Sequence, residues 1–377
     1  MIRAFTEPIY VTRPLLPPLD DVRARLEEVW RSQWLTNWGD QHVRLERALT
    51  DRLGVAQLSL FNNGTIALLV AIRALDLRGE VITTPFTFPA TPHALAWTGV
   101  TPVFADIDPV RLTIDPARVE ALITPRTTAI LGVHVYGVPC DVEALAAIAS
   151  RHRLQLLYDG AHAFGVRCGG RGIGTFGDAT MFSFHATKLF HTAEGGAIAC
   201  ADAALRHRIE RQKNFGIAGQ ELVECVGING KMNELQAALG LSVLANMDVE
   251  IDQRRAILAI YQERLGGVRG LTLMPELPGV ENSYQYCAVR IDGSRFGQSR
   301  DEVQQTLKTY NVFARKYFYP LCSDYDCYHD LPSADPACLP VARLAASQVL
   351  CLPLYGSLEP SAVHTICDIV LSNRKGP

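Results

Sequence analysis

Lys188 has the strongest potential for covalent chemistry, because its surroundings in the chain are apolar. Its large apolar neighbours are Phe182, Phe184, Leu189 and Phe190. Most lysines are solvated surface charges, and that remains the alternative interpretation of a single lysine. A lysine in apolar surroundings, however, has a lowered pKa and becomes a nucleophilic amine near neutral pH. We therefore predict that Lys188 can form an imine with a carbonyl compound.

Asp159 directly follows the apolar residues 154–158, which are typical of a buried strand. Ligands of open parallel sheets bind beyond the carboxyl ends of the strands. A carboxylate there can hold a protonated pyridine nitrogen and so make the ring an electron sink. The alternative is a turn or helix N-cap aspartate. His162 lies three residues further on, and a lone histidine is more often structural than catalytic.

Gly64 and Thr65 lie between an expected strand and an expected helix. A helix N-terminus binds phosphate through free N–H groups, glycine allows close approach, and threonine adds a hydroxyl. Ser183, at the end of another apolar strand, could add a second hydroxyl. Taken alone, a simple turn is the favoured interpretation of the Gly64 segment. It matches neither a nucleoside triphosphate loop nor a dinucleotide fingerprint.

Phe88 belongs to residues 86–91, which follow the expected strand at 80–84. An aromatic ring at this point could stack on a flat cofactor. Core packing explains any single phenylalanine at least as well.

These residues require a scaffold in which strands and helices alternate. Apolar strands are expected at 58–61, 80–84, 101–107, 128–136, 154–158, 179–184 and 196–201, with helices at 65–75, 92–98 and 142–152. Nearly continuous apolar strands alternating with helices are typical of a mostly parallel sheet covered on both faces. We predict an α/β fold.

The flanking segments suggest a second, smaller domain. Other expected elements are helices at 20–33, 41–53, 233–265 and 299–310, strands at 284–291 and 349–352, and a last helix beginning at Pro360. The helix at 299–310 opens with a capping box, Ser299 to Glu302. We predict an N-terminal arm and large cofactor-binding domain over 1–250, and a small α+β domain over 251–377.

Composition excludes several classes of protein. The 377 residues carry a formal net charge of -3, which disfavours nucleic-acid or anionic-membrane partners. No apolar run approaches the ~20 residues of a membrane helix, and the N-terminus lacks a signal-peptide core. Ten cysteines include no C-x-x-C pair, and Cys322, Cys327 and His329 form the nearest approach to a metal cluster. We expect reduced thiols, no metal and a cytosolic enzyme.

Several motifs occur in order along the chain: 63–68 (NGTIAL), 81–88 (VITTPFTF), 102–108 (PVFADID), 134–137 (HVYG), 159–163 (DGAHA), 182–188 (FSFHATK) with 194–196 (EGG), and 227–236 (GINGKMNELQ). Together they resemble the motifs of the DegT/DnrJ/StrS family of pyridoxal-phosphate-dependent nucleotide-sugar aminotransferases. They follow the family's order over most of the chain. The resemblance implies a fold-type I, aspartate-aminotransferase-like enzyme with pyridoxal 5'-phosphate as cofactor.

The resemblance also implies roles in catalysis. Lys188 would form the imine with the cofactor and then move protons between cofactor and substrate carbons. Asp159 would pair with the pyridine nitrogen. His162 would bond the phenolic oxygen, where many relatives have glutamine.

The remaining implied residues hold the cofactor. Phe88 would stack on its ring, and Gly64, Thr65 and Ser183 would bind its phosphate. Asn229 would reach the phosphate bound by the neighbouring subunit, which implies a homodimer with shared active sites.

Within the family, the motifs around Asp159 and Lys188 are most similar to those of transaminases that make dTDP-4-amino-4,6-dideoxyglucose. This implies amino transfer from L-glutamate to a C-4 keto group of a dTDP-linked 4-keto-6-deoxy sugar, for deoxyamino-sugar and O-antigen or lipopolysaccharide biosynthesis. The alternatives are transfer to C-3, sugar dehydration, and a non-catalytic regulatory protein. Dehydratases of the family replace the lysine by histidine, whereas Lys188 is retained. Residues 315–320 could bind a sugar pyrophosphate or be a solvated strand edge.

Overall fold

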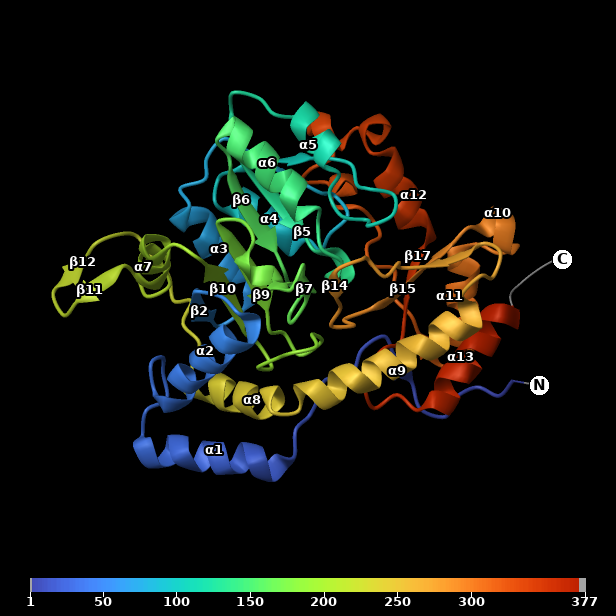
Figure 1. The fold of residues 1–377 in the computed structure, drawn as a ribbon, viewed down its shortest axis with the longest axis horizontal. Helices are drawn as coiled ribbons and strands as arrows, with labels where there is room; N and C mark the ends of the chain where they lie inside the picture. Colours follow the sequence, from blue (N-terminus) through green and yellow to red (C-terminus); the bar gives the residue numbers. More distant parts are fainter. Residues whose placement is uncertain (1, 373–377) are drawn as a thin grey trace.

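A central sheet built from residues 57–200 organises the molecule (Figure 1). The computed structural model describes residues 2–372, and within them seven strands form this sheet in the order β2-β10-β9-β6-β5-β3-β4. β10 is antiparallel to both of its neighbours, and the other pairs are parallel. The strands are β2 (Gln57–Phe61), β3 (Glu80–Thr83), β4 (Thr101–Phe104), β5 (Thr127–Val133), β6 (Gln155–Asp159), β9 (Ala179–Ser183) and β10 (Gly196–Cys200). The predicted mostly parallel α/β sheet is confirmed.

Helices cover both faces of the sheet, so its strands are apolar on both sides. One face packs against α3 (Gly64–Ala74), α4 (Ala90–Trp97) and α7 (Ala203–Gln212). The other face packs against α2 (Asp40–Leu53), α5 (Pro116–Ala121), α6 (Val142–His152) and α8 (Glu234–Leu244). Helix α1 (Leu19–Ser32) lies outside this layer, next to α8 (Figure 1). The two apolar layers hold the strand ends in fixed positions.

The long helical stretch predicted over 233–265 is helical, but two helices occupy it. Helix α8 begins with a capping box between Asn233 and Gln236, and α9 (Met247–Leu265) follows after a break at Ala245 and Asn246. The Asn246 side chain donates to the backbone oxygen of Ser242, 2.9 Å away. An asparagine that bonds its own preceding turn competes with helix continuation. Helix α9 then leads away from the large sheet (Figure 1).

A smaller sheet follows α9, in the order β13-β15-β17. Its elements and neighbours are β13 (Leu271–Leu273), β15 (Cys287–Ile291), α10 (Gly293–Phe296), α11 (Arg300–Thr309), α12 (Pro340–Gln348), β17 (Val349–Leu352) and α13 (Pro360–Ser372). The predicted capping box of Ser299 and the helix start at Pro360 are confirmed. Strand β15 begins three residues later than predicted, because Tyr284 has a φ of 58°, outside the extended region.

Short elements complete the chain and had no sequence signal of their own. They are β1 (Ile9–Tyr10), β7 (Arg167–Cys168), β8 (Arg171–Gly172), β11 (Ile217–Gly219), β12 (Leu222–Val223), β14 (Val280–Glu281), β16 (Val312–Phe313), and the 3₁₀ turns η1 (Val135–Gly137), η2 (Ile173–Thr175), η3 (Cys322–Asp324), η4 (Pro332–Ala334) and η5 (Pro336–Cys338). Strand β1 pairs in parallel with β16, so the start of the chain lies against its later part. The division at residue 250 stays a prediction.

The described residues contain neither a membrane-spanning helix nor a metal-binding cluster. None of the helices within residues 2–372 combines the length and the apolar composition that crossing a bilayer requires. The same residues contain no group of three or more His, Cys, Asp and Glu side chains placed to hold a metal ion.

A buried ion pair fixes α9 to the segment after β17. Arg254 and Glu250 lie one turn apart, 2.6 Å from nitrogen to oxygen, and both are buried. The Glu250 carboxylate also accepts the backbone N–H of Gly356 at 2.9 Å. Removing one partner of such a pair leaves an uncompensated charge in a medium that cannot solvate it.

We therefore expect Glu250→Ala to lower the free energy of unfolding by about 3–5 kcal/mol. The matched control is Asp252→Ala on the same helix, because its pair with Arg255 is exposed to solvent and should contribute little to stability. Urea denaturation of both variants under the same conditions measures the difference. Equal midpoints for the two variants would contradict the structural role of the buried pair.

Candidate active site

A cavity of about 750 Å³ lies at the carboxyl ends of β5, β6 and β9. The predicted site residues that line it are Gly64, Thr65, Phe88, Asp159, His162, Ser183 and Lys188. Its remaining wall includes Tyr286, Arg315, Tyr317 and Phe318, which come from the chain beyond α9. Asn229 is the one predicted site residue that does not line the cavity among the described residues. The ordered motifs of the sequence thus meet at one place.

Asp159 is the last residue of β6, and its side chain is only 5% exposed. Its Oδ2 accepts the hydroxyl of Thr91 at 2.7 Å, and its Oδ1 accepts the backbone N–H of Ala161 at 3.0 Å. Burial raises the pKa of Asp159, while these hydrogen bonds and the nearby Lys188 oppose that rise. The carboxylate is therefore held in one orientation within the cavity wall.

Thr91 is a functional candidate that the sequence analysis did not single out. Its hydroxyl lies 2.8 Å from that of Thr87, so a short chain of hydroxyl groups ends on Asp159. The available signal was the spacing of the two threonines, four residues apart at the start of a helix. Their link to Asp159 spans 68 residues of sequence and has no local signature.

A tight turn after β9 presents Lys188. The backbone N–H of Lys188 donates to the oxygen of His185 at 2.8 Å. The buried Gln285 holds this turn from outside: it accepts the N–H of Leu189 at 2.7 Å and donates to the oxygen of Thr187 at 3.2 Å. Gln285 was also missed, because its partners are almost 100 residues away in the chain.

The predicted lowering of the lysine pKa agrees with the geometry. Burial lowers the pKa of Lys188 to about 8, and the Asp159 carboxylate opposes that lowering. Phe184 and Phe190, which flank the turn in the chain, meet edge to face at 4.8 Å between ring centres and are fully buried. Because Lys188 is buried, the neutral amine is more populated near neutral pH than it is for a solvated lysine.

The N-terminus of α3 packs closely on the end of β9. A methyl group on Gly64 would lie 2.9 Å from Cβ of Ser183, so a glycine is needed for this approach. The Asn63 side chain caps the helix by accepting the N–H of Ile66 at 2.8 Å. The first residues of the helix, Gly64 and Thr65, line the cavity together with Ser183. This is the arrangement that binds a phosphate group.

His162 has a defined protonation state. Burial lowers the pKa of His162 well below its usual value, so the ring is neutral. Its Nδ1 accepts the backbone N–H of Tyr136 at 3.3 Å, which leaves the proton on Nε2. The ring lies parallel to that of Phe318 at 5.8 Å and meets Tyr286 edge to face at 5.0 Å. His162 therefore offers a single N–H donor of fixed orientation.

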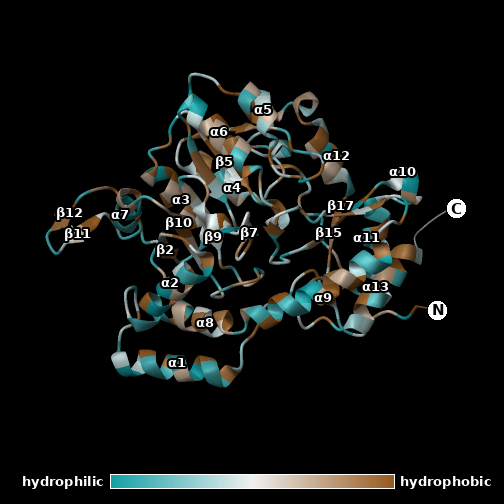
Figure 2. Cartoon of the chain, viewed as in Figure 1, coloured by the Kyte–Doolittle hydropathy of each residue, from teal (hydrophilic) through white to brown (hydrophobic). Residues whose placement is uncertain are grey.

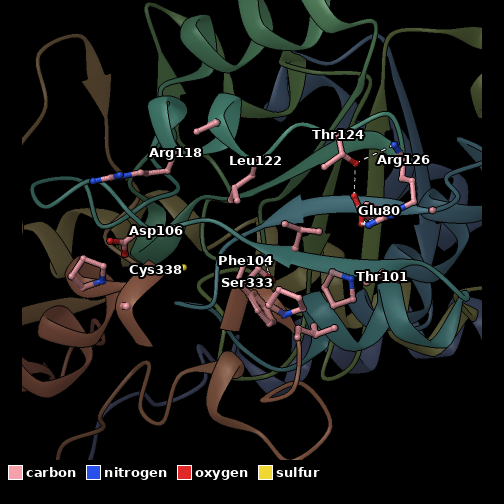
Figure 3. Close-up of a pocket in the computed structure, with 18 residues that line it drawn as sticks. Glu80, Thr101, Phe104, Asp106, Arg118, Leu122, Thr124, Arg126, Ser333 and Cys338 are labelled. Atoms are coloured by element: carbon pink, nitrogen blue, oxygen red, sulfur yellow. Dashed lines mark hydrogen bonds and ion pairs between the residues drawn. The ribbon is translucent and has the colours of Figure 1, made fainter. Parts of the chain in front are cut away.

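A larger cavity, of about 860 Å³, runs along the edge strand β4 (Figure 3). The Glu80 carboxylate in it accepts hydrogen bonds from Arg126 and from Thr124, and a dashed line in Figure 3 marks the bond to Thr124. Asp106 accepts the backbone N–H groups of the first turn of α12, at 3.0 and 2.8 Å. The two carboxylates that line this larger cavity, Glu80 and Asp106, thus already have hydrogen-bond partners within the protein. The lining residues of the cavity include no lysine or histidine. We therefore place the reaction in the smaller cavity.

The pKa of Lys188 predicts how the protein without cofactor takes up pyridoxal phosphate. Only the neutral amine adds to a carbonyl, so the rate should rise with pH and level off above a midpoint near 8. An ordinary lysine would give a midpoint near ~10.5. Asp159→Asn should move the midpoint to lower pH, because it removes the charge that stabilises the ammonium form. Stopped-flow absorbance measures this rate, and a rate still climbing steeply above pH 9.5 would refute the prediction.

Comparisons with known proteins agree with this geometry. The model of the DegT/DnrJ/EryC1/StrS aminotransferase family matches residues 20–371. A dTDP-4-amino-4,6-dideoxy-D-glucose transaminase of Shigella dysenteriae is 43% identical in sequence, and the match covers 97% of this chain and 98% of the relative. A transaminase of the same name from Escherichia coli is 44% identical, and the match covers 96% of this chain and 98% of the relative. The crystal structure of DesI with its TDP-sugar product superimposes with a TM-score of 0.94 at 38% identity, covering 98% of this chain and 94% of that one. The structure of the Helicobacter pylori aminotransferase PseC superimposes with a TM-score of 0.91 at 29% sequence identity, and the match covers 98% of this chain and 99% of PseC. The chain belongs to the DegT/DnrJ/EryC1/StrS aminotransferase family and is a pyridoxal-phosphate-dependent aminotransferase.

Proposed function

We propose that this protein transfers the amino group of L-glutamate to the C-4 keto group of dTDP-4-keto-6-deoxyglucose, for deoxyamino-sugar biosynthesis. The observation that carries this proposal is the similarity to the two dTDP-4-amino-4,6-dideoxy-D-glucose transaminases, which extends over nearly the whole of each chain. The amino donor and the keto sugar would occupy the same cavity one after the other, so the reaction would consist of two half-reactions.

The polar groups of the cavity match those of pyridoxal phosphate. We assign Asp159 to the pyridine nitrogen, because it is the oriented carboxylate of the cavity. We assign the Nε2–H of His162 to the phenolic oxygen, which needs a donor and here receives one of fixed direction. Phe88 lines the cavity with a side chain that is 58% exposed, and it would stack on the ring. When bound, the cofactor supplies an electron sink for the reacting carbon.

The phosphate of the cofactor would lie at the N-terminus of α3. Gly64 contributes the close approach, and Thr65 and Ser183 contribute hydroxyl groups. The partial positive charge of the helix end favours a phosphate dianion there. The carbonyl end of the cofactor would then meet Lys188.

Lys188 has the properties that proton transfer requires. A pKa of about 8 lets its Nζ both accept and release a proton near neutral pH. Gln285 and the His185 oxygen hold the turn, so Nζ returns to the same position after each transfer. The Asp159 carboxylate would hold the pyridine nitrogen of the bound cofactor in its protonated form. Dehydratases of the family carry histidine in place of this lysine, so Lys188 favours amino transfer.

The deciding experiment supplies the purified holoenzyme with L-glutamate and either dTDP-4-keto-6-deoxyglucose or its 3-keto isomer, and identifies the product by NMR. We expect an amine at C-4 and a visible absorbance band of the bound cofactor. Lys188→Ala should abolish turnover and change that band, because the amine is lost. Lys316→Ala is the control, since Lys316 pairs with Asp301 and does not line the cavity. Amination at C-3 alone, or an active protein without visible absorbance, would disprove the proposal.

The proposal includes a homodimer in which Asn229 serves the site of the partner. Asn229 is exposed, bonds Lys231 at 2.7 Å, and lies outside the cavity of its own subunit. It sits at the base of the hairpin β11–β12, which projects from the molecule (Figure 1). The large apolar side chains exposed on and beside this hairpin are Phe215, Ile217, Leu222, Val223, Val226 and Ile228. Figure 2 shows the hydrophobic residues of this hairpin in brown. A projecting hairpin with exposed apolar side chains is typical of a contact between subunits.

Hybrid dimers test the shared site. Lys188→Ala and Asn229→Asp each damage one site, the second by placing a negative charge beside the phosphate. If Asn229 serves the partner, a hybrid of the two variants has one site with both changes and one intact site. Co-expressed variants should therefore recover about half the wild-type activity per hybrid dimer. No recovery in hybrids purified with two different tags, or a monomer on sedimentation, would count against the shared site.

A further inference from the structure

The side chain of Thr91 reaches the active site through Asp159. Thr91 is fully buried in the first turn of α4, and among the described residues it is not part of the cavity lining, whereas Thr87 and Asp159 are. Its hydroxyl donates to Oδ2 of Asp159 at 2.7 Å. A side chain in this position acts on a ligand of the cavity through the carboxylate that it contacts.

The hydroxyl groups of Thr87 and Thr91 form a chain of hydrogen bonds that has one direction. A hydroxyl has a single hydrogen to donate, and Thr91 gives its hydrogen to the Asp159 carboxylate. The Thr91 oxygen must then accept the hydrogen of Thr87, whose oxygen lies 2.8 Å away. In the reverse direction Asp159 would carry a proton and the Thr87 hydroxyl would need a further acceptor, yet within residues 2–372 its one partner is Thr91. The chain therefore favours the ionised carboxylate.

The segment that carries the two threonines is held in place by the chain beyond α9. Cys322, which is fully buried in η3, donates its backbone N–H to the Pro85 oxygen at 3.0 Å and its thiol to the Thr87 oxygen at 3.3 Å. Burial raises the pKa of Cys322 to about 12, so the thiol keeps its hydrogen. The backbone N–H of Thr91 donates to the Phe88 oxygen at 3.2 Å. Both threonines thus have a fixed backbone from which their hydroxyl groups reach toward Asp159.

We propose that Thr91 is a positioning residue, which together with Thr87 holds the Asp159 carboxylate ionised and oriented toward the pyridine nitrogen of the cofactor. This inference rests on the part of the proposed function that pairs Asp159 with that nitrogen. The backbone N–H of Ala161 holds Oδ1 and the Thr91 hydroxyl holds Oδ2, so the plane of the carboxylate is fixed. Each carboxylate oxygen can accept more than one hydrogen bond, so one of them can accept from the protein and from the cofactor together. A protonated ring nitrogen needs an ionised partner to remain an electron sink.

Binding of two ligands to the protein without cofactor tests the inference. One ligand is pyridoxal phosphate, and the other is its analogue with carbon in place of the ring nitrogen, which offers no N–H to Asp159. Both carry the aldehyde that reacts with Lys188, so the ratio of their dissociation constants isolates the contact at the ring nitrogen. Thr91→Val keeps the shape of the side chain but loses the hydroxyl. It should lower the preference for pyridoxal phosphate about tenfold, because a charge-assisted hydrogen bond becomes a neutral one.

Three further variants separate the hydroxyl from packing and from stability. Thr91→Ser loses a methyl group but keeps the hydroxyl, so it should retain the wild-type ratio. Thr91→Cys keeps a weaker donor and should give an intermediate ratio, which tests the inference even where the valine variant does not fold. Thr83→Val is the matched control, because Thr83 is also fully buried but its hydroxyl donates to the Leu131 oxygen at 2.8 Å. It should lower the melting temperature and leave the ratio unchanged.

The same ratios separate this inference from the proposed function. If the wild type prefers pyridoxal phosphate and Thr91→Val prefers it equally, Thr91 has no positioning role, and the pairing of Asp159 with the ring nitrogen stands. If the wild type binds both ligands equally, that pairing is itself wrong, and the inference is overturned with it. A loss of preference in Thr91→Ser as large as that in Thr91→Val would assign the effect to packing and would also overturn the inference. No sugar takes part in these measurements, so they do not depend on which keto sugar the enzyme aminates.

Discussion

The structure of the site depends on one electrostatic relationship, that between the Lys188 amine and the Asp159 carboxylate in a cavity that excludes much of the water. Burial lowers the pKa of Lys188 and raises the pKa of Asp159, so it favours the neutral form of each group. Their mutual attraction favours the charged forms and partly offsets the effect of burial. The balance leaves an amine able to exchange protons near neutral pH. Outside this setting, Lys188 would be an ordinary ammonium group.

The topology of the sheet brings these groups together. Strands β6 and β9 are parallel neighbours, so their carboxyl ends lie at the same edge and carry Asp159 and the turn to Lys188. Strand β10 returns antiparallel beside β9, and a methyl group on Gly196 would lie 2.8 Å from the backbone at Asn63. Small residues thus let the start of α3 reach the ends of these strands. The phosphate-binding end and the amine are placed by the same packing.

The sequence allowed the fold class, the positions of the large-sheet strands along the chain and seven of the residues that line the cavity to be predicted, because apolar strands and polar strand ends are local features. It did not reveal Thr91 or Gln285 as supports of Asp159 and Lys188, because their contacts join residues 68 and 96 positions apart. The break at Asn246 depends on a single side-chain hydrogen bond, which apolar periodicity does not register. Strands such as β11 and β12 have two or three residues, too few for an alternating pattern.

The cavity has two kinds of wall, and they serve different purposes. The sheet edge supplies the groups that match the cofactor, and these are the motifs by which the chain resembles its family. Tyr286, Arg315 and Phe318 come from the chain beyond α9 and form the wall that a substrate would meet. Phe318 packs edge to face on Phe86 at 5.8 Å and lies parallel to Tyr136 at 6.2 Å, so this wall rests on the loops that follow β3 and β5 of the large sheet. The two walls thus share a support but come from different parts of the chain, so residues of the substrate-facing wall can change while the cofactor-facing motifs are preserved. Such a division along the chain suits a family that uses one cofactor chemistry on different sugars.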